Sequence, residues 1–131
     1  MIIDTSVIIA ILRDEAGASD CALAIEKTRS RRISAASFVE TALVIDGSRD
    51  PIASRRFDEF FKEANISVER VTLEQACLAR EAYRDFGKGS GHPAKLNFGD
   101  CVAYVLAKAA GEPLLFKGDN FIHTDISSAL G

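Results

Sequence analysis

The sequence is poor in features that would mark it as a metal-thiolate or secreted protein. It has three cysteines, Cys21, Cys77 and Cys101, without the paired C-x-x-C spacing of a metal site. Each falls in a segment rich in Ala and Leu, where a free cysteine commonly packs as a small apolar residue. An odd, scattered count indicates a reducing compartment rather than a disulfide-bonded secreted domain.

An excess of positive charge is also absent. The chain has 19 acidic residues against 16 Lys plus Arg, so its net charge is −3. A protein that binds nucleic acid through its overall charge usually has a net positive charge. Any phosphate contact here must therefore be local or bridged by cations. The two histidines, His92 and His123, lack the spacing of an acid–base pair, which argues against a histidine-based nuclease.

Long apolar runs are missing as well. No stretch approaches the roughly 18 residues that a membrane span needs, and Met1 is followed by two isoleucines and Asp4 instead of a basic leader. We therefore expect a cytoplasmic protein without a membrane partner. With 131 residues, 47% of them hydrophobic, and no repeat or linker, a single domain over residues 1–131 is expected.

The chain alternates short apolar runs with longer segments of helical spacing. The runs predict strands at Met1–Ile3, Arg32–Ser34, Ile66–Val71 and Pro113–Phe116. The helical segments are Ser6–Arg13, Ala18–Arg29, Phe38–Ile45, one opened by Pro51, Leu73–Phe86 and Phe98–Ala110, the last with Gly111 as its C-cap. Residues 87–95, with three glycines and a proline, predict a loop. The alternation predicts an α/β fold with a parallel sheet covered on both faces.

Acidic residues occupy comparable places in these segments: Asp4, Glu40, Asp100 and Asp119. Taken singly, the aspartates are explained as helix caps, with Asn97 and Asp100 forming a capping box and Asp119 capping a short helix. Glu40 lies inside a helix among apolar neighbours, where a solvated face is the alternative.

Taken together, the four acids suggest a shared site. Ligands of a parallel α/β sheet bind at the carboxyl ends of its strands, where Asp4 and Asp119 lie and toward which Asp100 and Glu40 can lean. Carboxylates that converge within a few ångströms raise one another's pKa, and a divalent cation relieves the repulsion. Oxygen ligands without a His or Cys pair favour Mg²⁺, with Mn²⁺ as a substitute, over zinc.

Four motifs also carry a family resemblance: "MIIDTSVIIAIL", "ISAASFVET", "LNFGDCVAYVLAK" and "LLFKGDNFIHTDI". In this order, and over essentially the whole chain, they resemble the PIN-domain ribonucleases, most closely the VapC toxins of bacterial toxin–antitoxin pairs. The resemblance implies a three-layer α/β/α domain with a central parallel sheet of four or five strands. It also implies a metal-dependent endoribonuclease that cuts tRNA, rRNA or mRNA and so inhibits translation and growth.

The resemblance assigns roles to individual residues. Asp4, Glu40, Asp100 and Asp119 correspond to the family's catalytic, metal-binding acids. Thr5 and Ser6 stand where the family places a hydroxyl beside the first aspartate, Asn97 is a common neighbour of the third acid, and Asp125 matches a C-terminal strand as a further acid. A homodimer and a cognate VapB-type antitoxin that covers the site are also implied.

Our mechanistic hypothesis is that Asp4 and Asp100 hold Mg²⁺ most directly, and that in-line attack of water leaves a 5′-phosphate and a 3′-hydroxyl. Candidate RNA contacts are the basic residues Lys88, His92, Lys95, Arg31 and Arg32, although surface cations most often serve only solubility. The alternative function is a catalytically silent PIN-like module that binds RNA or a protein partner. A phosphotransferase of the haloacid-dehalogenase type would need an aspartate where Ser6 stands.

Overall fold

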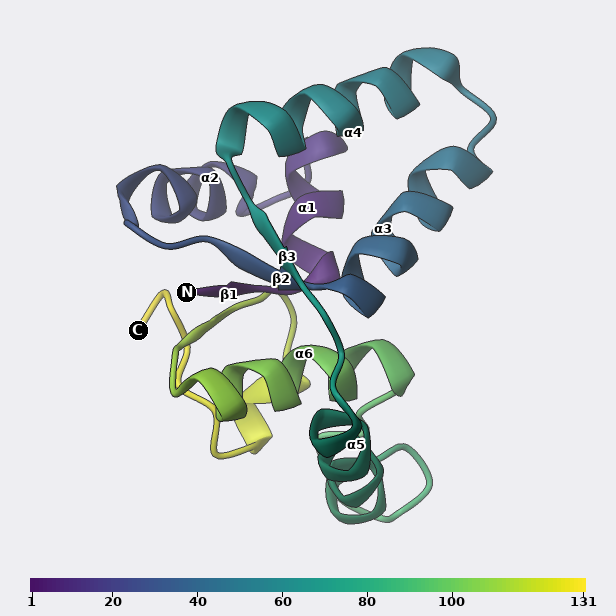
Figure 1. Cartoon of the computed structure of the whole chain (residues 1–131), viewed down its shortest axis with the longest axis vertical. Helices are drawn as coiled ribbons and strands as arrows, with labels where there is room; N and C mark the ends of the chain where they lie inside the picture. Colours follow the sequence, from purple (N-terminus) through teal and green to yellow (C-terminus); the bar gives the residue numbers. More distant parts are fainter.

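A single parallel sheet divides the molecule into two helical layers in the computed structural model, which describes all 131 residues (Figure 1). Its strands are β1 (Ile2–Ile3), β2 (Arg32–Ser34), β3 (Ser67–Glu69) and β4 (Leu114–Leu115), in the order β3-β2-β1-β4. All three neighbouring pairs are parallel. A lone bridge between Leu114 and Ser128 stands in place of a fifth strand. The predicted α/β fold class with a parallel sheet is confirmed.

Six α-helices and one short 3₁₀ helix complete the fold. They are α1 (Thr5–Leu12), α2 (Ala18–Lys27), α3 (Ala35–Gly47), α4 (Pro51–Ala64), α5 (Leu73–Phe86), α6 (Phe98–Ala110) and η1 (Phe121–His123). The predicted ranges of α5 and α6 agree with the structure at both ends. Helix α3 begins earlier than predicted because the Ser34 hydroxyl accepts a hydrogen bond from the backbone N–H of Ala36 and caps it. None of these helices has the length and apolar character that a membrane crossing requires.

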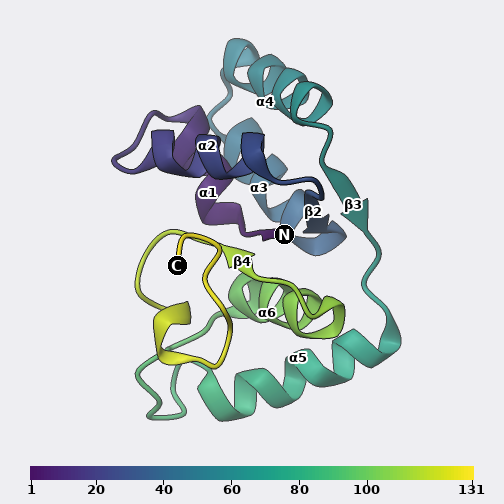
Figure 2. The same ribbon diagram turned by 90° about the vertical axis from the view of Figure 1, so that its left-hand side faces the viewer.

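The two helical layers are joined through the alternating side chains of the strands. Helices α1 to α4 cover one face of the sheet, and α5, α6 and the C-terminal segment cover the other (Figure 2). Ile2 and Leu114 pack into the core with α6, whereas the next residues, Ile3 and Leu115, pack into the core with α1 and α3. Successive strand residues point to opposite faces, so even strands of two residues connect both layers.

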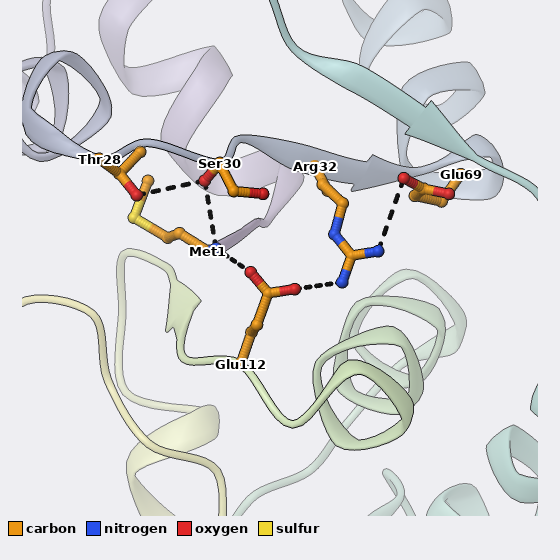
Figure 3. Close-up of polar contacts among 6 residues, drawn as sticks. All are labelled: Met1, Thr28, Ser30, Arg32, Glu69 and Glu112. Carbon is orange, nitrogen blue, oxygen red and sulfur yellow. Dashed lines mark hydrogen bonds and ion pairs between the residues drawn. The ribbon is translucent and has the colours of Figure 1, made fainter.

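At the amino end of the sheet, a charged network links all four strands (Figure 3). The carboxylate of Glu112, two residues before β4, binds both the amino group of Met1 and the guanidinium of Arg32. A second carboxylate, that of Glu69 in β3, lies 3.6 Å from Arg32. The hydrogen bond from the Met1 amino group, followed by that from Arg32, holds the pKa of Glu112 below its ordinary value. Negative charge at this end of the sheet is therefore compensated.

Replacing Glu112 tests this network. We expect Glu112→Gln to lower the free energy of unfolding near neutral pH by about 1–2 kcal/mol, because Arg32 and Met1 lose their anionic partner. The pKa of Glu112 is lowered by folding, so its contribution is present above the ordinary value of 4.5 and is lost as the pH falls through the folded value. Urea denaturation near neutral pH, and again below the folded pKa of Glu112, measures the effect. Glu69→Gln, which loses only the longer contact, is the matched control, and equal stability of the two variants would contradict the interpretation.

Candidate active site

Asp4 lies at the carboxyl end of β1 and begins the site. Its side chain is only 4% exposed. One carboxylate oxygen, Oδ2, accepts hydrogen bonds from the backbone N–H of Ser6 at 3.1 Å and from the Ser6 hydroxyl at 2.6 Å. The predicted cap of α1 is therefore present. The second oxygen, Oδ1, is buried without a hydrogen-bond partner, and capping does not account for it.

The Ser6 hydroxyl is itself held in place by the neighbouring strand connection. It accepts a hydrogen bond from the backbone N–H of Lys117 at 3.0 Å, just beyond β4. The backbone N–H of Asp4 donates to the carbonyl of Leu115 at 2.9 Å. The ends of β1 and β4 thus fix the orientation of the Asp4 carboxylate through backbone groups.

Glu40 reaches the same region from α3. Its Oε1 accepts a hydrogen bond from the Thr5 hydroxyl at 2.6 Å, and Thr5 in turn accepts one from the Thr41 hydroxyl at 3.2 Å. The carboxylate also lies against the backbone of α6: a Cβ atom at Gly99 would stand 2.1 Å from Oε2 of Glu40. Only glycine at position 99 leaves room for Glu40 in this position.

Asp100 occupies the first turn of α6 in the predicted capping box. Its backbone N–H donates to Oδ1 of Asn97 at 2.9 Å, and its Oδ2 accepts from the backbone N–H of Asn97 at 3.1 Å. The amide of Asn120 donates to the same Oδ2 at 3.2 Å, which leaves Oδ1 without a protein donor. Sequence reasoning did not identify Asn120, whose only signal was its place beside Asp119.

These carboxylates influence one another electrostatically. Burial raises the pKa of Asp4 to about 6, and the negative charges of Asp100 and Glu40 act in the same direction, against the hydrogen bonds from Ser6. The structure therefore brings three of the four predicted acids into one neighbourhood, at the carboxyl end of the sheet.

Asp119, the fourth of these acids, and Asp125, the further acid near the C-terminus, behave differently. Asp119 is exposed and makes no hydrogen bond or ion pair, and its charge is not among those that act on Asp4. The predicted cap by Asp119 was wrong, because Asn120 precedes η1 and its side chain makes no capping bond. Asp125 accepts from the Tyr104 hydroxyl at 2.5 Å and pairs with Lys108 at 2.8 Å. Its side chain anchors the C-terminal segment to α6 instead of joining the acids.

No three acidic, histidine or cysteine side chains form a preassembled metal-binding group, so the tight convergence expected of four carboxylates is not seen. Asp4, Glu40 and Asp100 are instead each held by their own protein donors, and like charges without a cation repel one another. The donor chemistry nonetheless suits a hard cation: the ligand atoms are oxygens, and Oδ1 of Asp4 is buried without a partner.

The predicted RNA contacts fall into two groups. Arg31 and Arg32 lie at the amino end of the sheet, where they bind the Ile25 carbonyl and Glu112 respectively, so the structure does not bring them to the acids. Lys88 and Lys95 are exposed in the loop before α6 and form no ion pair. In the same loop His92 has a structural contact, because its Nδ1 accepts from the backbone N–H of Ala94 at 3.1 Å.

The buried charge of Asp4 predicts a stability change of unusual sign. Folding raises the pKa of Asp4 from 3.8 to about 6, so the metal-free protein should lose stability as the pH rises between these values. Asp4→Asn, which cannot ionise but can still cap α1, should be more stable than the wild type near neutral pH, by about 2–3 kcal/mol. The difference should vanish near pH 4.

Urea denaturation in excess chelator measures this difference. Asp58→Asn, the same substitution at an exposed position of α4, is the control and should show no such pH dependence. If Asp4→Asn were less stable than the wild type at neutral pH, the buried charge of Asp4 would not be destabilising and this interpretation would be wrong.

Comparison with known proteins identifies the family. A model of the PIN domain matches residues 1–127. Ribonuclease VapC28 of Mycobacterium tuberculosis is 57% identical over 130 residues, which cover 99% of this chain and 98% of that protein. Ribonuclease VapC42 of the same organism is 47% identical over 129 residues, or 98% of each chain.

A solved structure supports the fold. The crystal structure of Mycobacterium tuberculosis VapC20, described as a sarcin–ricin-loop-cleaving toxin, matches 95% of both chains with a TM-score of 0.72. At 14% identity this likeness concerns the fold alone. The sequence match over nearly the whole chain confirms the resemblance seen in the motifs, and the chain therefore belongs to the PIN-domain family, with VapC ribonucleases as its relatives.

Proposed function

We propose that this protein is a divalent-cation-dependent endoribonuclease and the toxin of a toxin–antitoxin pair, acting on RNA in the cytoplasm. The observation that carries the proposal is the unpartnered, buried Oδ1 of Asp4, with Asp100 and Glu40 close enough to affect its pKa. A chain that is 57% identical to a VapC ribonuclease supports the choice of RNA as substrate.

The residues fit one hard cation, Mg²⁺ or Mn²⁺. Asp4 and Asp100 would hold it most directly, because each keeps its Oδ1 free of protein donors. Glu40 and the exposed Asp119 would contribute directly or through water. When bound, the cation would offset the negative charge of the scissile phosphate and lower the pKa of an attacking water.

The surrounding side chains orient the carboxylates for cation binding. Ser6 holds one oxygen of Asp4, Thr5 holds one oxygen of Glu40, and Asn97 together with Asn120 holds one oxygen of Asp100. Each of these three acids is fixed through one oxygen, and its other oxygen accepts no hydrogen bond from the protein. Such partners of metal ligands typically change metal affinity or activity about 10–100-fold when removed.

The surface around the acids is also where we expect the RNA substrate and a protein partner to bind. The exposed Lys88 and Lys95 can contact phosphates close to α6, where positive charge is needed against a net charge of −3. Unpaired loops are the parts of a structured RNA that proteins most often recognise, so we expect the substrate to offer such a loop. We further propose a VapB-type antitoxin that covers the acids, and a homodimer, as the family resemblance implies.

The cation requirement can be tested on the purified protein with a mixed RNA pool. Cleavage should require Mg²⁺ or Mn²⁺, stop in excess chelator, leave 5′-phosphate ends, and fall at least about 100-fold in Asp100→Asn, because the loss of a ligand removes several kcal/mol of charge stabilisation. Calorimetric titration with Mn²⁺ should show a matching loss of binding. Asp58→Asn on α4 should cleave like the wild type, whereas cleavage that persists in chelator would exclude the cation mechanism.

Gly99 provides a test that leaves every acid in place. In Gly99→Ala the new methyl group must displace the Glu40 carboxylate, which is the flexible end of a side chain, so stability should change by less than about 1 kcal/mol while cleavage falls roughly 10-fold or more. Gly47→Ala at the end of α3, where a Cβ meets no atom within 4 Å, is the control. Unchanged cleavage by Gly99→Ala would show that the position of Glu40 is unimportant.

A further inference from the structure

An apolar groove of ≈ 700 Å³ lies between α5, α6 and the start of α3. We propose that it binds one unstacked nucleobase of the RNA substrate, next to the bond that is cut. This inference rests on the proposed ribonuclease function and adds a substrate subsite to it.

The groove opens directly beside the acids because the same helices build both. Ala36 in its wall stands one helical turn before Glu40 on α3, and Asn97, which also lines the groove, is hydrogen-bonded to Asp100. Much of its lining is apolar and comes from Ala76, Ala79, Cys101, Val102 and Val105. A nucleotide whose phosphate lies at the acids can therefore place its base in this groove.

Two aromatic side chains of the groove are left in solvent. Phe98 is 73% exposed and packs against no other aromatic ring, in contrast to the four phenylalanines that cluster around α4. Tyr83 is 48% exposed, yet its hydroxyl donates to the Lys88 carbonyl at 3.1 Å and its ring lies over Gly87, where a Cβ would come within 2.7 Å of Cδ1. Folding does not bury these rings, and Tyr83 is fixed in place. Exposed, oriented rings are the surfaces on which bases stack.

The charges around the groove favour a nucleotide over an apolar peptide. Arg80 and Lys88 line it, both exposed and without an ion pair, while Asp100 lies just beyond Phe98. A protein partner that bound in the groove and offered basic residues to the acids would be repelled by Arg80 and Lys88, which carry the same charge. RNA presents flat apolar base faces and an anionic backbone, which match the groove and the cations respectively. Because the lining offers few polar groups, the subsite should accept different bases.

The test uses single-stranded RNA oligonucleotides that carry one 2-aminopurine, bound to the full chain in an Asp4→Asn background to prevent cleavage. Phe98→Ala should weaken binding about 5- to 100-fold and abolish the quenching of 2-aminopurine, as expected for the loss of one stacked base. Phe98→Tyr should restore both. Leu73→Ala, at an 81% exposed apolar position of α5 outside the groove, should bind like its parent.

A second measurement separates this inference from the proposed function. An abasic nucleotide at the 2-aminopurine position should weaken binding to the parent protein and leave binding to Phe98→Ala unchanged. If the wild type cleaves RNA but neither Phe98→Ala nor the abasic nucleotide affects binding, the groove inference is overturned, the function stands, and a protein partner becomes the better occupant. If the wild type neither binds nor cleaves RNA, both are overturned.

Discussion

The burial of the Asp4 carboxylate is the constraint around which the rest of the site is arranged. The side chain stands at the end of a central strand with water largely excluded, and the protein satisfies only one of its oxygens. Burial and two neighbouring carboxylates oppose its ionisation. A fold selected for stability alone would replace such a group or give it a cationic partner. Its retention is typical of a site that receives positive charge from outside.

The two ends of the sheet show how differently the protein treats its charges. At the amino end, Glu112 is matched by Arg32 and by the amino group of Met1, and the network holds the strands together. At the carboxyl end, Asp4 and Asp100 have hydrogen-bond donors but no cation among their hydrogen-bond partners. Compensation at one end stabilises the short strands. At the other end this compensation is missing, which is the basis of the proposed cation-dependent chemistry.

The start of α6 connects the proposed catalytic acids to the proposed nucleobase subsite. Within a few residues it carries the capping amide of Asn97, the exposed ring of Phe98, the glycine that admits Glu40 and the carboxylate of Asp100. The lysine-bearing loop leads directly into this turn. Because a helical turn fixes the relative positions of these groups, the same segment can orient an acid and present a surface to a base. In our proposal, a protein with an overall negative charge thereby confines its attraction for RNA to one local surface.

Local sequence determined most of the secondary structure. The spacing of apolar residues gave both ends of α5 and α6, Pro51 marked the start of α4, and Asn97 with Asp100 formed the capping box that the pattern predicts. These features depend on residues within one or two turns, so they can be read along the chain. The positions of Asp4 and Asp100 at the ends of apolar segments, and of Glu40 inside a helix, followed from the same patterns and from the family resemblance.

Only the tertiary structure decided which side chains meet. Arg32 was a candidate RNA contact until its partner Glu112, 80 residues away, placed it at the opposite end of the sheet. Asp119 and Asp125 resembled each other as acids near the C-terminus, yet one remains free in solvent and the other binds Tyr104 and Lys108. The contact of Gly99 with Glu40 had no local signal, and that of Asn120 with Asp100 had none beyond the place of Asn120 beside Asp119. The partner of a side chain depends on how distant elements pack, and this packing is determined by the whole core and not by the neighbouring sequence.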